Sequence, residues 1–207
     1  MDDLSFTTFL KLALMPTTPG KFGVLNRMLT TSGGYDFYKR MKLAAQAVAQ
    51  GKTPAEDVLS KLKKIKKDAE RQHNLLMARR FLTWWSGMHG AVALADRPKG
   101  IFRTPDMHFG VKLVPELAYQ QEGSAYVTYL WATKMPRLTR QMAGVGLYML
   151  RQELMSKVPG ARFQILDLRQ EVVFSEDCIT NQTASLMAAD IASINSIWAS
   201  IALPKAA

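Results

Sequence analysis

Two proline–acid pairs and one lysine are the residues whose types and spacing could perform chemistry. The pairs are Pro105-Asp106 and Pro115-Glu116, and Lys134 closes a run of alternating residues just before a helix signal. Two acidic side chains together can hold a divalent cation that polarises a phosphate and activates water. Asp106, Glu116 and Lys134 are therefore the weak catalytic candidates, and metal-dependent cleavage of nucleic acid is the reaction that they would support.

Short runs of β-branched and aromatic residues, bounded by turn residues, must position these candidates. We expect strands at 102–103, 107–114, 125–133, 162–168 and 171–174, and helices at 137–157 and 182–203. The strand at 125–133 is apolar on both faces, which is typical of a strand inside a sheet. Asp106 and Glu116 then fall at strand ends or turns, where surface carboxylates are common.

The succession of strands, helix and strand over roughly residues 101–175 resembles the core of the restriction-endonuclease-like superfamily, the PD-(D/E)XK nucleases. The resemblance implies that one strand carries an acid and the next carries acid-X-Lys, with Lys134 matching the family's lysine. Ala132 stands where the family has its second carboxylate. Because one carboxylate seldom holds the cation, the resemblance implies a degenerate active site. Enzymatic activity is uncertain, and its absence is favoured.

The first half of the chain is predicted to be helical and basic. Helices are expected at 4–15 and 35–50, and a third helix begins with Thr53 as N-cap, Pro54 in the first turn and Glu56 completing a capping box. Apolar residues of this third helix gather on one stripe, and basic residues gather opposite. The candidate nucleic-acid-binding residues on that face are Lys61, Lys63, Lys64, Lys67 and Arg71.

The positive charge is concentrated in the same half. Residues 1–103 carry 18 basic and 8 acidic side chains, whereas residues 104–207 carry 9 of each, so the first half accounts for the net charge of +10. Such asymmetry indicates a surface that meets an anionic partner, with DNA or RNA the commonest. A solvated basic face that only maintains solubility is the alternative interpretation.

Composition limits the remaining classes. With 207 residues and one cysteine, Cys178, the chain can form no internal disulfide, and its three histidines have no metal-ligand spacing, so we expect no metal site and no cofactor. The acidic residues after Met1 do not resemble a secretory signal. Asp190 and Asn195 interrupt the longest apolar segment, which we interpret as a helix outside the membrane. A cytoplasmic location is expected.

Together these features predict an α+β fold, with a helical N-terminal half followed by a small mixed sheet flanked by helices. We expect a basic helical region at 1–100 and a sheet-containing α/β region at 101–207, or one continuous domain. The leading hypothesis is a noncatalytic nucleic-acid-associated protein that binds the phosphate backbone through its basic helix. A structural or adaptor subunit, acting through Met-rich helices on a protein partner or in a homo-oligomer, is the alternative. An active metal-dependent nuclease comes third.

Overall fold

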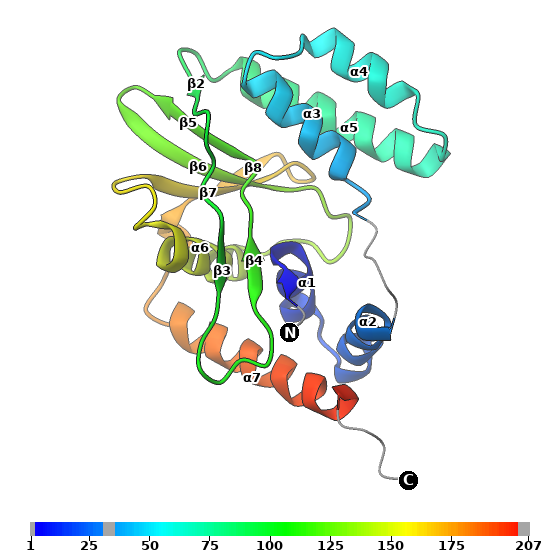
Figure 1. Cartoon of the computed structure of the whole chain (residues 1–207), viewed down its shortest axis with the longest axis vertical. Coiled ribbons are helices and arrows are strands. Elements are labelled where there is room, and N and C mark those ends of the chain that lie inside the picture. Colours follow the sequence, from blue (N-terminus) through cyan, green and yellow to red (C-terminus); the bar gives the residue numbers. More distant parts are fainter. Residues whose placement is uncertain (1–2, 31–35, 203–207) are drawn as a thin grey trace.

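The computed structural model describes residues 3–30 and 36–202, which form an α+β fold, as predicted from the sequence (Figure 1). The α-helices are α1 (Phe6–Leu14), α2 (Thr18–Thr30), α3 (Lys39–Ala49), α4 (Ala55–Lys63), α5 (Asp68–Ser86), α6 (Arg140–Leu154) and α7 (Thr183–Ala202). The strands are β1 (Leu4–Ser5), β2 (Val92–Ala93), β3 (Gly100–Phe102), β4 (Val111–Leu113), β5 (Leu117–Gln121), β6 (Ser124–Trp131), β7 (Arg162–Asp167) and β8 (Val172–Phe174). A 3-10 turn, Glu176–Cys178, precedes α7.

A five-stranded sheet in the order β2-β5-β6-β7-β8 forms the centre of the molecule. β5 and β6 are an antiparallel hairpin whose turn uses the positive φ angles of Glu122 (49°) and Gly123 (73°). β6 then runs parallel to β7, from Tyr126 opposite Arg162 to Trp131 opposite Asp167. Such a parallel pair needs a crossover connection, and α6 supplies it.

A second sheet joins the two halves of the sequence. Its order is β1-β4-β3, and β1 pairs parallel to β4 with Leu4 opposite Val111. The strand predicted at 107–114 is therefore only the short β4, and it belongs to this smaller sheet. The antiparallel neighbour of β6 is β5, which the sequence analysis missed.

Two apolar clusters lie on opposite faces of the large sheet. Alternate residues of β6 point to each, with Val127 in the cluster of α1, α6 and α7, and Leu130 in the cluster of α3, α4 and α5. Each large side chain buried there contributes roughly 1.5–3 kcal/mol. Both clusters contain residues from before and after position 100, for example Phe6 beside the α6 residues and Phe81 beside the β7 residues. Regions 1–100 and 101–207 therefore share their cores.

Several predicted boundaries differ from the structure. The prediction of a single basic helix is wrong, because this part of the chain forms two helices, α4 and α5. The predicted capping box is also wrong: Pro54 occupies the N-cap position with an extended ψ of 153°, and no side chain caps α4. The first residue of the helix predicted at 35–50 and the last of that at 182–203 lie outside the described residues. Within the described residues, α7 contains the one segment, Thr183–Ile201, long and apolar enough to cross a membrane.

Candidate functional site

The lysine-rich segment lies at the connection between α4 and α5, which form a helical hairpin (Figure 1). Leu62 and Ile65 are buried in the cluster beneath it. These two anchors turn the intervening lysines outward, and five are exposed: Lys61, Lys63, Lys64, Lys66 and Lys67. We call residues 61–67 the basic elbow.

The break between the two helices has a physical cause in the same residues. Lysines three or four positions apart on one helix repel one another, as Lys63 and Lys67 would in a continuous helix. Folding back lets both helices bury their apolar sides, with Val58 of α4 and Met77 of α5 in one cluster. The elbow therefore relieves repulsion and completes the core.

Arg71, the fifth predicted binding residue, is less exposed than the lysines, with 35% of its side chain accessible. One guanidinium nitrogen donates to the carbonyl of Ile65 at 3.1 Å, and another is paired with Asp68. Arg71 thus ties the first turn of α5 to the elbow. These contacts help to hold the elbow in place.

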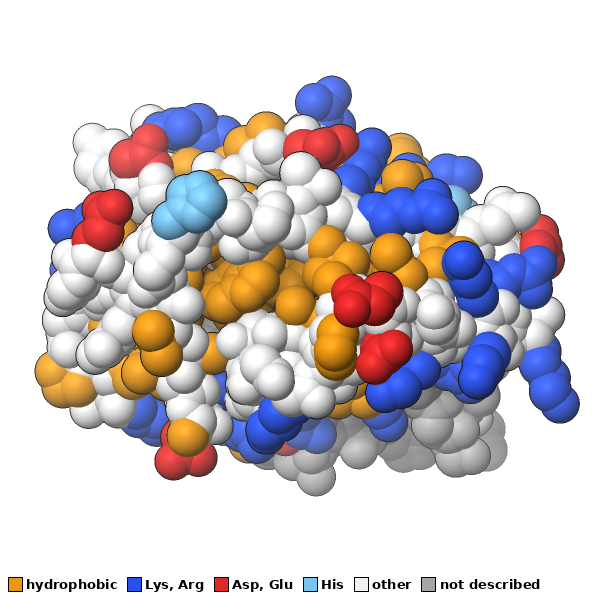
Figure 2. All heavy atoms as spheres, turned by 90° about the horizontal axis from the view of Figure 1, so that it is seen from above, with side chains coloured by type: hydrophobic (Ala, Val, Ile, Leu, Met, Phe, Trp, Pro, Cys, Tyr) orange, Lys and Arg blue, Asp and Glu red, His pale blue; other side chains and the backbone are white. Residues whose placement is uncertain are grey.

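Four lysines of the elbow lie outside the ion pairs of the described structure. No ion pair among the described residues involves Lys61, Lys63, Lys64 or Lys66. Figure 2, a view onto these helices, shows Lys and Arg side chains gathered at the end of the molecule that carries the elbow. A concentration of exposed ammonium groups on one rigid connection is able to contact successive phosphates.

The nuclease candidates are not assembled into one site. Asp106 is exposed in the connection between β3 and β4, where its carbonyl oxygen accepts a hydrogen bond from Asn195 of α7. Glu116 lies beyond the other end of β4, and Lys134 is exposed in the loop after β6. No group of three or more His, Cys, Asp or Glu side chains in the described part of the chain could hold a metal ion.

Glu116 instead belongs to a buried ion pair that the sequence gave no means of finding. Its carboxylate lies 2.9 Å from the ammonium of Lys42 on α3, and side-chain exposure is only 14% for Lys42 and 6% for Glu116. The second carboxylate oxygen accepts the backbone N–H of Leu130 at 2.7 Å. Both oxygens therefore have partners within the fold, and the charge of Lys42 balances that of the carboxylate.

Lys42 remains an ammonium group in this environment. Burial by itself would lower the pKa of Lys42, but Glu116 and Tyr129 outweigh burial, and the pKa is raised above its ordinary value. The ammonium also lies 4.9 Å from the centre of the Tyr129 ring and 3.4 Å from its hydroxyl. A lysine held protonated in this way cannot act as a nucleophile or a general base.

Tyr129 extends the buried pair to α1. Its hydroxyl lies 2.6 Å from the hydroxyl of Thr7, and burial raises the pKa of the phenol, with Lys42 opposing that effect. Phe6 packs edge-on against the same ring at 4.6 Å between centroids. The phenol is neutral at ordinary pH and acts as a hydrogen-bonding group.

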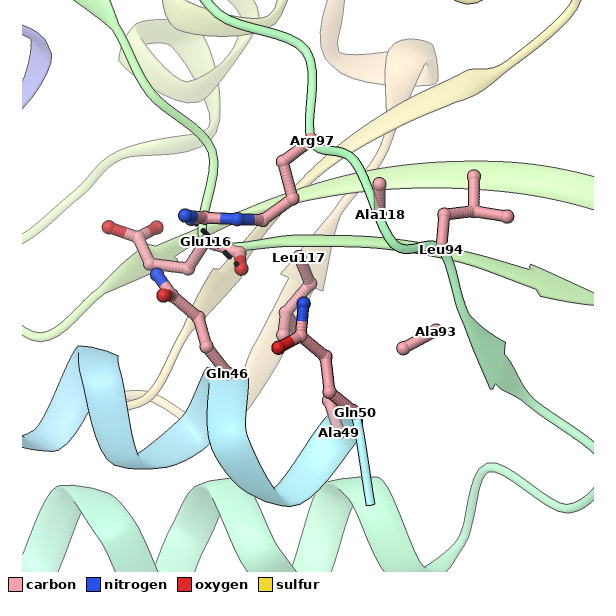
Figure 3. A pocket seen from close by; sticks show the side chains of 9 residues that line it. All are labelled: Gln46, Ala49, Gln50, Ala93, Leu94, Arg97, Glu116, Leu117 and Ala118. Carbon is pink, nitrogen blue, oxygen red and sulfur yellow. Dashed lines mark hydrogen bonds between the residues drawn. The ribbon is translucent and has the colours of Figure 1, made fainter. Parts of the chain in front are cut away.

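A small recess lies beside Glu116, at the start of β5 (Figure 3). Gln46 of α3 and Arg97 approach Glu116 from different elements. Arg97 donates hydrogen bonds to the carbonyl oxygens of Pro115 at 3.1 Å and Glu116 at 3.4 Å. The recess has a volume of only about 10 Å³, which is room for no more than one water molecule. The hydrogen bonds of Arg97 therefore serve to hold the backbone at the start of β5.

Two larger cavities lie around the Lys42–Tyr129 contact. One of about 450 Å³ lies among α1, the residues preceding α3, and the end of β6, and one of about 350 Å³ lies between α3 and β4. Ser5, Asp36, Lys42, Lys112 and Tyr129 line both. The buried pair thus separates two spaces of a size suited to small molecules.

Comparison with known proteins identifies no relative: no family model and no curated protein matches this sequence.

Proposed function

We propose that this protein binds the phosphate backbone of a nucleic acid through the basic elbow, without cutting it. The observation that carries this proposal is the exposure of five lysines within seven residues, held in place by buried Leu62 and Ile65. Phosphate contacts of this kind give affinity without base recognition, so DNA and RNA are both candidate partners.

The buried pair supports a noncatalytic role. Glu116 is bound by Lys42 and by the N–H of Leu130, and Asp106 lies beyond the opposite end of β4. A metal-dependent nuclease would need these carboxylates to share a cation. We therefore propose that any resemblance to the PD-(D/E)XK core does not extend to its metal-binding carboxylates.

Fluorescence anisotropy with labelled single-stranded DNA, duplex DNA and RNA tests the proposal. If four or five phosphates are contacted, the affinity for a duplex should fall with a log–log salt slope of about −4. Replacing Lys61, Lys63 and Lys64 together with Ala should make this slope shallower by about 2.7 and weaken binding to all sequences alike.

A variant with the same loss of charge elsewhere provides the control. Lys52, Lys99 and Lys134 are exposed and lie outside the elbow. Their joint replacement by Ala should leave most of the affinity and the slope in place. Absence of binding at low salt, or equal losses in the two triple variants, would refute the proposal.

A further inference from the structure

We propose that the 450 Å³ cavity is a binding site for a small organic anion, a molecule that carries a phosphate or carboxylate group on an aromatic or apolar body. The volume falls within the usual range for small-molecule sites. This proposal concerns α1, α3 and β6, and it is independent of the basic elbow.

The lining has the mixed character that such a molecule requires. Polar groups come from the start of α1, from the strands and from the residues before α3, and the charged ones are three lysines (Lys11, Lys42 and Lys112) and two carboxylates (Asp3 and Asp36). Apolar surface comes from Met28, Phe37, Tyr38, Leu130 and Ala132. Apolar and aromatic side chains can cover a ring, while a few placed polar groups fix the orientation of a ligand. A bare inorganic ion would leave the apolar part of this lining without contact.

Lys11 supplies a positive charge that has no direct ion pair among the described residues, although the Asp36 carboxylate lies in the same lining and attracts it. Lys42 is paired with Glu116, and Lys112 lies 3.7 Å from Asp3, but Lys11 forms no ion pair with any described residue. Burial lowers the pKa of Lys11, with Lys42 adding to the effect and Asp36 opposing it. An anionic group beside Lys11 would stabilise its charged form.

Thr7 supplies a hydrogen-bond donor next to this charge. The ammonium of Lys42 can only donate to the Tyr129 oxygen, and the hydroxyls of Tyr129 and Thr7 share a hydrogen bond in which either can be the donor. When the phenol is the donor, the proton of Thr7 is left for another acceptor. Because Thr7 lines the cavity, that proton is available to an oxygen of a bound anion.

Isothermal titration with phenyl phosphate, benzoate and uncharged phenol, at low ionic strength, tests the site. Phenyl phosphate or benzoate should bind with a dissociation constant of about 1 mM or tighter, and phenol at least about tenfold more weakly. The anion that binds more tightly shows whether the site prefers a phosphate or a carboxylate group. Failure of both anions to bind at about 20 mM, well above that constant, would overturn the proposal.

Variants locate the binding. Lys11→Met should weaken the binding of whichever anion binds more tightly by about tenfold or more, since one charge-assisted contact is lost. Thr7→Val should weaken the binding of the same anion by a factor of about three to ten. Lys52→Met, which removes an exposed lysine away from the cavity, should have no effect. Equal affinity in the wild type and Lys11→Met would refute the assignment.

Chemical modification gives a readout that needs no variant. Acetylation at pH 8, followed by peptide mapping, should modify Lys11 more slowly when phenyl phosphate is present, while Lys52 is modified at an unchanged rate. Equal protection of both lysines would indicate general screening and would count against the site.

Discussion

Replacement of Lys42 by Met should strongly destabilise the protein, because it leaves the Glu116 carboxylate buried without its counterion. At the observed separation of 2.9 Å, Coulomb's law gives about 6 kcal/mol for the pair at an effective dielectric constant of about 20. Part of this attraction is offset by the desolvation of both charges. Removal of one partner of such a pair typically costs about 3–5 kcal/mol.

Urea denaturation, monitored by circular dichroism, measures this loss in the free energy of unfolding. For a chain of this size, about 3–5 kcal/mol corresponds to a melting temperature lower by about 6–20 °C. Lys39→Met is the matched control, since Lys39 is exposed on the same helix, and its free energy of unfolding should change by less than about 0.5 kcal/mol.

A double variant separates the charge effect from the loss of packing. In Lys42→Met combined with Glu116→Gln, no buried charge remains, and the Gln oxygen can still accept the N–H of Leu130. Most of the lost stability should return, giving a coupling energy of at least about 2 kcal/mol. A cost below about 1 kcal/mol for Lys42→Met, or additive effects in the double variant, would refute this reasoning.

Three further predictions test other parts of the structure. Folding raises the pKa of Lys42 above its unfolded value of 10.5, so the stability that its charge contributes is fully present below pH 10.5. Above pH 10.5 the free energy of unfolding of the wild type, measured by urea denaturation, should fall by about 1.4 kcal/mol per pH unit relative to that of Lys42→Met. Gly144→Ala places a Cβ 2.2 Å from the carbonyl oxygen of Cys178 and should cost about 1–3 kcal/mol in denaturant titrations, whereas Gly23→Ala, with no atom within 4 Å, should be neutral or stabilising. Thr139 caps α6 through the N–H of its third residue, so Thr139→Ala should cost about 1 kcal/mol, seen as a lower melting temperature; an unchanged value would exclude that cap.

The parts of the fold that sequence predicts best are long and periodic. The strand expected at 125–133 is β6, and the helices expected at 137–157 and 182–203 contain α6 and α7. β5 escaped notice because only five residues separate Glu116 from the turn at Glu122, which leaves too short an alternation to recognise. The elbow between α4 and α5 was missed because helical spacing continues through it, and because the packing that adds to lysine repulsion in causing the break depends on the rest of the molecule.

The site was less predictable than the fold. Leu62 belongs to the apolar stripe of the sequence, and the elbow lysines lie away from that stripe. The exposure of these lysines could therefore be predicted from the sequence. Glu116 was selected as a possible metal ligand, yet its partner lies on a helix 74 positions earlier, and no local pattern connects the two. Lys11 and Thr7 had no distinguishing motif, because only the folded arrangement brings α1 to the end of β6.

The pairing of β1 with β4 also affects how the chain can be made. Leu4 is synthesised more than a hundred residues before Val111, its partner across the small sheet. At a translation rate of about 5–20 residues per second, the first strand waits for roughly 5–20 s before its neighbour is even polymerised. During that interval Phe6 and Phe9, both buried in the finished protein, have no sheet to cover them. Nascent chains stalled before residue 111 should therefore bind chaperones that recognise apolar segments, and longer ones should release them.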